Sequence, residues 1–126
     1  MPEQILLVDD NSIQATTRKA ILERVGFSVT TFTSAKDALL FLKEEGKDSV
    51  GLVITDHIMP ELSGTAFVFQ LRQWNQKVPV IVLSGLEEAE DEYKGYNIIF
   101  RTKPIAPDEL QALAIRLLNT PISQTV

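Results

Sequence analysis

Short apolar runs alternate along the chain with stretches in which apolar residues recur every three or four positions. Runs of the first kind are typical of buried strands, and stretches of the second kind are typical of amphipathic helices. Regular alternation of the two indicates βαβ units, which place parallel strands beside one another. The sequence therefore predicts an α/β fold in which five strands form one sheet.

The apolar runs are short enough for strands, which we expect at residues 4–8, 28–32, 50–55, 78–83 and 97–100. A stretch of helical period follows each run. We expect the first helix to begin near Asn11 or Ser12 and the second to be capped by Ser34. The third should follow the loop that ends at Gly64, and the last two should begin near Glu87 and Pro107. No repeat or internal linker interrupts the pattern, so it predicts one domain.

Residues at helical spacing define the faces that we expect to pack on the sheet. They are Ile13, Thr17, Ala20, Ile21 and Val25 in the first helix, Ala35, Ala38, Leu39 and Leu42 in the second, Phe67, Val68, Leu71 and Trp74 in the third, and Leu110, Leu113, Ala114 and Leu117 in the last. The stretch 87–94 is strongly acidic and almost without such a face. We expect it to be the least ordered element.

Composition limits the class of protein. With 126 residues, 44% of them hydrophobic, the chain can bury a core without disulfides. It has no cysteine, which excludes thiolate metal sites. A formal net charge of -5 argues against nucleic-acid binding, and no apolar stretch is long enough to cross a membrane. We expect a cytoplasmic domain over residues 1–120 and a flexible tail over 121–126.

Charged side chains follow the expected strands at their carboxyl ends. Asp9 and Asp10 follow the first strand, Asp56 follows the third, and Lys103 comes after the fifth. The carboxyl ends of parallel strands meet at one edge of a sheet, where α/β proteins bind ligands. Three carboxylates and one ammonium group suit a divalent cation and a phosphoryl group, because Mg²⁺ prefers oxygen ligands and often shares them with phosphate.

Four short motifs in this order resemble the receiver domain of two-component response regulators over nearly the whole chain. They are Leu7-Val8-Asp9-Asp10-Asn11, Asp56-His57-Ile58-Met59-Pro60 with Gly64 beyond it, Ser84-Gly85, and Lys103-Pro104. Each motif alone is weak, but their order and spacing on a repeated strand–helix pattern are specific. The resemblance implies a single-domain, three-layer (βα)5 sandwich: a five-stranded parallel sheet in the order 2-1-3-4-5 with helices on both faces.

The resemblance also implies a chemistry for the acidic residues. Asp56 corresponds to the phosphoacceptor, which takes a phosphoryl group from a histidine kinase or a histidine phosphotransfer protein. Asp10, Asp56 and the carbonyl oxygen of Ile58 correspond to direct ligands of Mg²⁺, and Asp9 to a ligand that acts through water. Such a chain would be a signalling switch that catalyses only its own phosphorylation and dephosphorylation, not a turnover enzyme.

Further residues correspond to the rest of that site. Lys103 matches the cation that binds a phosphoryl oxygen, and its bond to Pro104 matches a cis peptide. Ser84 matches the switch hydroxyl that moves toward the new phosphoryl group, and Phe100 matches the coupled aromatic that turns inward. The output partner stays unidentified, and we expect a monomer or a weak homodimer.

Several of these residues also have ordinary structural explanations. Asp9 and Asp10 could cap the first helix, and Lys103 could be a solvated surface lysine. Ser84 could be a turn residue, and Phe100 could be a static core aromatic. The context of the four motifs favours the functional interpretation.

Three remaining features bear on function. We assign no phosphotransfer or metal binding to His57, because the donor histidine of this family lies on the partner and a single histidine is a poor metal site. Ile58 and Leu86 are apolar and flank the expected approach of water, so we expect a long-lived phosphoryl group. The chain between Ser84 and Lys103 is about a turn shorter than usual in the family, which favours receivers of hybrid kinases or stand-alone receivers.

Two other functions remain open. One is a Mg²⁺-dependent phosphohydrolase with an aspartyl nucleophile, but such enzymes usually have an acid two residues after the nucleophile, where this chain has Ile58. The other is a binding module that works without phosphorylation. Such a module has no need for the intact acidic set.

Overall fold

The computed structural model describes residues 4–118, so the expected tail at 121–126 lies outside the described residues. The strands are β1 (Gln4–Val8), β2 (Ser28–Phe32), β3 (Leu52–Asp56), β4 (Val80–Ser84) and β5 (Ile99–Thr102). The helices are α1 (Ser12–Glu23), α2 (Ala35–Glu45), α3 (Gly64–Trp74), the 3-10 helix η1 (Glu87–Tyr93) and α4 (Pro107–Leu118). Strand and helix alternate, as the sequence predicts.

The strands form one parallel sheet in the order β2-β1-β3-β4-β5, which confirms the predicted order. β3 lies at its centre, where Ile54 pairs with Leu7 of β1 and with Ile81 of β4. Every residue of β3 is buried. Leu52, Val53 and Ile54 are consecutive apolar residues of this strand, because both of its faces are covered.

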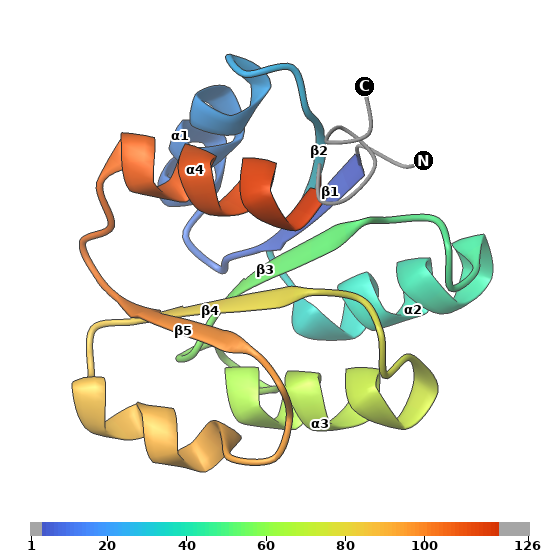
Figure 1. Cartoon of the computed structure of the whole chain (residues 1–126). Coiled ribbons are helices and arrows are strands. Elements are labelled where there is room, and N and C mark those ends of the chain that lie inside the picture. Colours follow the sequence, from blue (N-terminus) through green and yellow to red (C-terminus); the bar gives the residue numbers. More distant parts are fainter. Residues whose placement is uncertain (1–3, 119–126) are drawn as a thin grey trace.

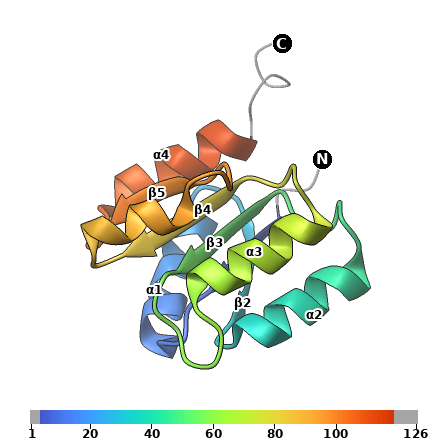
Figure 2. The ribbon, with the colours of Figure 1, turned by 90° about the horizontal axis from the view of Figure 1, so that it is seen from below.

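Helices cover the two faces of the sheet and complete the predicted three layers (Figures 1 and 2). α1 and α4 lie on one face, and α2, α3 and η1 lie on the other. Each face has its own core. Fully buried members are Leu7, Leu22, Ile54, Ile81 and Leu110 on the first face, and Leu6, Val53, Phe67, Val68 and Leu71 on the second.

Three strands begin about two residues later than the sequence predicts. Val50 and Val78 are buried, yet they precede β3 and β4. Pro79 also precedes its strand, where its missing backbone donor has no cost to the sheet. As a result Asp56 and Ser84 are the last residues of β3 and β4, held in the sheet itself.

The predicted inner face of α1 is wrong. The helix turns Ala15 and Leu22 toward the sheet, and Arg18 lies between them on the same face. This charged residue interrupts the apolar stripe, so a count of apolar residues favours nearly the opposite face. Of the residues that we assigned to the core, Ile21 is half-buried, and four are exposed: Ile13, Thr17, Ala20 and Val25. The predicted faces of α2, α3 and α4 are buried or half-buried.

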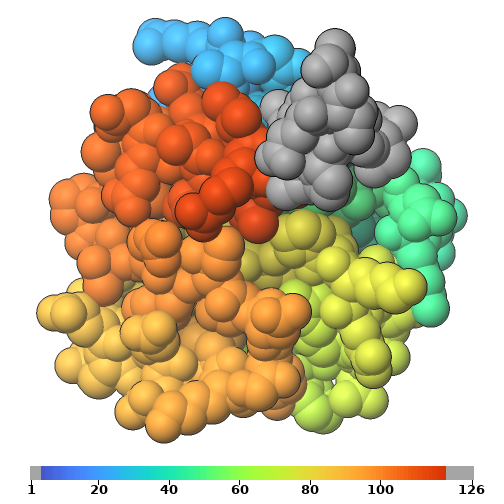
Figure 3. Space-filling model, in the orientation of Figure 1, coloured from blue at the N-terminus to red at the C-terminus, as the bar shows by residue number. Residues whose placement is uncertain are grey.

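The acidic stretch after β4 forms a 3-10 helix, η1, instead of an α-helix. Ala89 and Tyr93 of η1 are buried, so this element has more contact with the core than its sequence indicates. η1 and the segment after it make up a continuous part of one face of the molecule, next to α4 (Figure 3). That residues 87–94 are the least ordered element of the domain stays a prediction. Within residues 4–118, no helix combines the length and apolar character needed to cross a membrane.

Candidate functional site

Side chains from four strands meet at one edge of the sheet. Asp9 directly follows β1, Asp56 ends β3, Ser84 ends β4, and Lys103 directly follows β5. The hydrogen bonding between β4 and β5 continues one residue beyond the end of β5, because the Lys103 amide donates to the Ser84 carbonyl oxygen at 2.7 Å. The fold therefore gathers the residues that the sequence singled out, from positions far apart in the chain.

Asp56 lies at the centre of this edge and is only 3% exposed. The Lys103 Nζ lies 3.1 Å from its Oδ1. The pKa of Asp56 is raised from 3.8 to about 7, chiefly by burial and then by the hydrogen bond and the negative charge of Asp9, whereas Lys103 acts in the opposite direction. An ionised Asp56 is therefore costly in this site unless further positive charge is brought to it.

The carboxylates of Asp9, Asp10 and Asp56 offer oxygens within 4.8 Å of one another. Asp9 and Asp56 are buried, and Asp10 is exposed. The carbonyl oxygen of Ile58 accepts no backbone hydrogen bond from residues 4–118, so it can serve as another oxygen ligand. A cluster of hard oxygen donors, part buried and part open to water, fits Mg²⁺, which usually keeps several waters.

Arg18 is a site residue that the sequence reasoning missed. Its Nη1 lies 2.6 Å from Asp9 Oδ2 and 3.5 Å from Asp56 Oδ1, and its side chain is 12% exposed. The available signal was its position three residues after Ala15 and four before Leu22, which puts all three on one helical face. Two cations thus contact the buried carboxylates: Arg18 of α1 contacts Asp9 and Asp56, and Lys103, which follows β5, contacts Asp56.

Ser84 and Phe100 lie where a loop movement could link them. Ser84 is buried, and its hydroxyl accepts a hydrogen bond from the Leu86 amide at 3.0 Å and donates to the Leu86 carbonyl oxygen at 3.3 Å. Phe100 is 9% exposed and packs on Tyr93, with ring centroids 6.0 Å apart. The peptide bond between Lys103 and Pro104 is cis.

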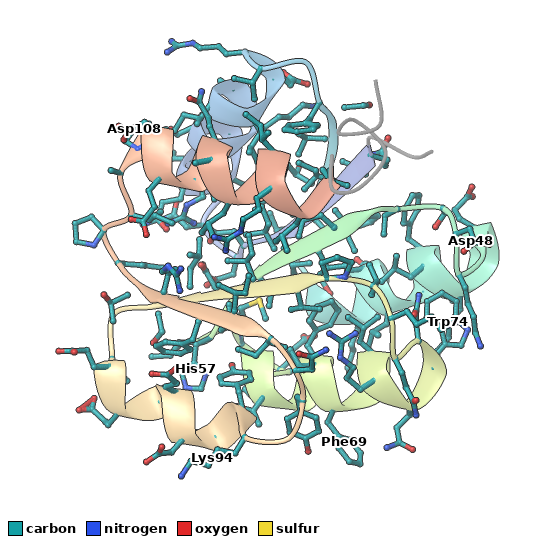
Figure 4. All side chains as sticks on the ribbon, viewed as in Figure 1. Asp48, His57, Phe69, Trp74, Lys94 and Asp108 are labelled. Carbon is teal, nitrogen blue, oxygen red and sulfur yellow. The ribbon has the colours of Figure 1, made fainter. Side chains whose placement is uncertain are left out.

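His57 forms a second contact that the sequence did not indicate. Its Nδ1 lies 2.6 Å from the hydroxyl of Tyr93, and both side chains are buried. Burial raises the pKa of Tyr93 to about 12. Figure 4 shows His57 directed toward η1. The segment after β3 is therefore tied to η1 by a hydrogen bond, and Tyr93 connects that bond to Phe100.

Gly64 makes this arrangement possible. A Cβ at this position would lie 2.5 Å from the Asp56 carbonyl oxygen and 2.6 Å from the Tyr93 hydroxyl. The Gly64 amide donates to the His57 carbonyl oxygen at 2.7 Å and closes the loop between β3 and α3. Only glycine allows the start of α3 to approach the segment after β3 so closely.

These observations define the class of fold: a five-stranded parallel α/β domain with acidic residues and a lysine at the carboxyl edge of its sheet. A family model described as "Response regulator receiver domain" matches residues 5–115. The chain therefore belongs to the response regulator receiver domains, the signalling switches of two-component systems. Members of this family generally use Mg²⁺ and act with histidine kinases and output domains.

Similar proteins differ in length. The chain is 32% identical over 122 residues to the alkaline phosphatase synthesis transcriptional regulatory protein PhoP of Bacillus subtilis, and this match covers 94% of the chain but 50% of PhoP. It is 30% identical over 129 residues to the two-component response regulator ORR11 of Oryza sativa subsp. indica, covering 93% and 82%. The chain thus spans about half the length of the bacterial relative.

Solved structures show the same fold. A response regulator receiver domain protein of Clostridium thermocellum matches with a TM-score of 0.85 and 27% identity, covering 96% of this chain and 98% of that one. The signal receiver domain of a histidine kinase of Syntrophus aciditrophicus matches with a TM-score of 0.84 and 29% identity, covering 94% and 91%. The predicted (βα)5 receiver fold is confirmed.

Proposed function

We propose that Asp56 is the phosphoacceptor of this receiver domain and takes its phosphoryl group from a histidine kinase or a histidine phosphotransfer protein. One observation carries the proposal: the buried Asp56 carboxylate contacts Lys103 and lies within 4.8 Å of the carboxylates of Asp9 and Asp10. The groups proposed as nucleophile, phosphate-binding cation and metal ligands are thus adjacent.

The transfer would be a displacement at phosphorus. A carboxylate oxygen of Asp56 attacks the phosphorus atom of a phosphohistidine on the partner, and the new O–P bond forms as the P–N bond breaks. The histidine nitrogen keeps the electron pair of the broken bond. Lys103, already 3.1 Å from Asp56 Oδ1, is placed to donate to a phosphoryl oxygen while charge develops on it.

Mg²⁺ fits the oxygen donors of this edge. Asp10, Asp56 and the carbonyl oxygen of Ile58 would hold it directly, and Asp9 would act through water. Bound there, it would neutralise negative charge on the carboxylates and on the phosphoryl oxygens.

Ser84 and Phe100 would convert this local change into a surface change. The Ser84 hydroxyl would leave Leu86, to which it bonds at 3.0 Å, and bond a phosphoryl oxygen instead. Moving a population from mostly one state to mostly the other takes about 5 kcal/mol of differential binding. Charge-assisted bonds from Ser84 and Lys103, at roughly 1.5–3 kcal/mol each, would supply most of it.

The phosphoryl group should be long-lived. Ile58 and Leu86 are 66% and 45% exposed, and neither carries a polar group that could orient an attacking water. We expect the aspartyl phosphate to persist for minutes or longer after the phosphodonor is removed in the presence of Mg²⁺. The phosphate adduct is monitored by mass measurement over time. Its loss within seconds would contradict this expectation.

The direct test is incubation with Mg²⁺ and acetyl phosphate followed by intact mass measurement. We expect a phosphate adduct on the wild type and none on Asp56→Asn. Asp48→Asn is a matched control, because Asp48 is exposed and precedes β3, whereas Asp56 ends that strand, and it should be phosphorylated like the wild type. Absence of the adduct from the wild type would count against the phosphoacceptor role. Repeated turnover of the phosphodonor would favour a phosphohydrolase instead.

A further inference from the structure

Arg18 makes the shortest contact with the acidic cluster, yet the proposed phosphoacceptor chemistry does not use it. Its Nη1 lies 2.6 Å from Asp9 Oδ2 and 3.5 Å from Asp56 Oδ1. Lys103 Nζ contacts the same Oδ1 of Asp56 at 3.1 Å. Asp9 therefore has Arg18 as its ion-pair partner, whereas Asp56 is shared between both cations.

This pair differs from an ordinary surface ion pair. The Arg18 side chain is 12% exposed and that of Asp9 is fully buried. Exposed pairs contribute little because water screens them, but a buried pair interacts strongly. Arg18 thus holds a positive charge against the buried carboxylates.

The same carboxylates are the expected ligands of the divalent cation. Asp9, Asp10 and Asp56 offer oxygens within 4.8 Å of one another, and Arg18 contacts two of these three residues. Two positive charges cannot share the Asp9 and Asp56 oxygens at these distances without strong repulsion. A bound cation and the present position of the guanidinium group are therefore in competition.

We propose that Arg18 is a built-in countercation of the acidic cluster, and that it must withdraw from Asp9 and Asp56 before a divalent cation binds. Arg18 thereby lowers the affinity of the site for Mg²⁺. The proposal deepens the proposed function, since it rests on Mg²⁺ as the ligand of this cluster. It makes Arg18 a positioning residue that sets the Mg²⁺ concentration at which the site becomes competent.

The test is a calorimetric titration of the unphosphorylated protein with Mg²⁺ alone. We expect Arg18→Gln to bind Mg²⁺ with a dissociation constant lower by about ten-fold or more, because the competing charge is removed. Arg24→Gln is the control: it removes the same charge from the exposed end of the same helix and should leave the affinity within about two-fold of the wild type.

A second variant and a second measurement guard against misfolding. Arg18→Met keeps an aliphatic side chain without the charge and should show the same gain in affinity. Mg²⁺ should also raise the urea midpoint of both uncharged variants by more than it raises that of the wild type. Unchanged or weaker Mg²⁺ binding in the folded variants overturns the proposal. Failure of both variants to fold would overturn it too, because Arg18 would then be a structural residue.

The result is separable from the proposed function. The same proteins are incubated with acetyl phosphate, and the adduct is measured by mass. If the wild type is not phosphorylated but Arg18→Gln binds Mg²⁺ more tightly, the phosphoacceptor role fails and the countercation role stands. If the wild type is phosphorylated and the Mg²⁺ affinity is unchanged by the substitution, the reverse holds.

Discussion

The α-carbon of Gly64 lies against the backbone that follows β3 and against Tyr93. An added Cβ would meet the Asp56 carbonyl oxygen at 2.5 Å, and a backbone atom cannot move away as a flexible side chain can. We expect Gly64→Ala to lower the free energy of unfolding by about 2 kcal/mol or more. Urea denaturation measures the change.

Gly85 provides the comparison for this substitution. A Cβ there would meet nothing within 4 Å. Gly85→Ala should therefore leave the free energy of unfolding within about 0.5 kcal/mol of the wild type. Equal effects of the two substitutions would show that loss of glycine itself, and not steric contact at Gly64, determines the result.

At the level of elements, Arg72 of α3 connects two loops. It is 8% exposed and donates to the carbonyl oxygens of Asn75 and Val78 after α3 and of Tyr96 and Asn97 before β5. Burial lowers the pKa of its guanidinium group. The short segment between η1 and β5 is thus held by side-chain hydrogen bonds from a neighbouring helix.

Replacing Arg72 should loosen that segment. Arg72→Met removes the donors to four carbonyl oxygens, and we expect a loss of about 2–4 kcal/mol in the free energy of unfolding. Amide hydrogen exchange should increase most at residues 94–98. Arg116→Met, on the exposed side of α4, is the matched control and should change neither quantity appreciably. Uniform acceleration of exchange across the domain would contradict a local role for Arg72.

For the whole molecule, the raised pKa of Asp56 links stability to pH. Above pH 7 the folded protein holds Asp56 as a buried anion, whereas the unfolded chain holds it as a solvated anion, so ionisation destabilises the fold. As the pH falls from 7 toward 4, only the folded state takes up this proton, and the destabilisation disappears. Asp56→Asn removes the titration altogether.

Asp56→Asn should therefore be more stable than the wild type at pH 8 in the absence of divalent cations, by on the order of 1–4 kcal/mol. The difference should shrink as the pH falls from 7 to 4. Urea midpoints across this range measure it. Millimolar Mg²⁺ should reduce the difference at pH 8 by stabilising the wild type. A difference that does not depend on pH would mean that Asp56 titrates normally.

How much the sequence could predict depended on the type of signal. The central sheet and the gathering of Asp9, Asp56 and Lys103 at one edge followed from apolar runs and from the residues placed after them. The order of the strands followed from the resemblance to receiver domains, because apolar runs alone do not fix which strands are neighbours. The face of α1 that packs on the sheet could not be predicted in this way, because the charged residue Arg18 interrupts its apolar residues. The contact between His57 and Tyr93 depends on how the loop after β3 approaches η1, and no local pattern encodes that approach.

The hydrogen bonds of Ser84 with Leu86 set the ease of any rearrangement at this edge. The Leu86 carbonyl oxygen also accepts from the Ala89 amide at 3.1 Å, so it keeps a partner if the hydroxyl leaves it. The Ser84 hydroxyl is itself buried and needs a new partner, which under the proposed function would be a phosphoryl oxygen. The Leu86 amide would accordingly be a sensitive NMR reporter, whose chemical shift follows the fraction of molecules in each loop arrangement.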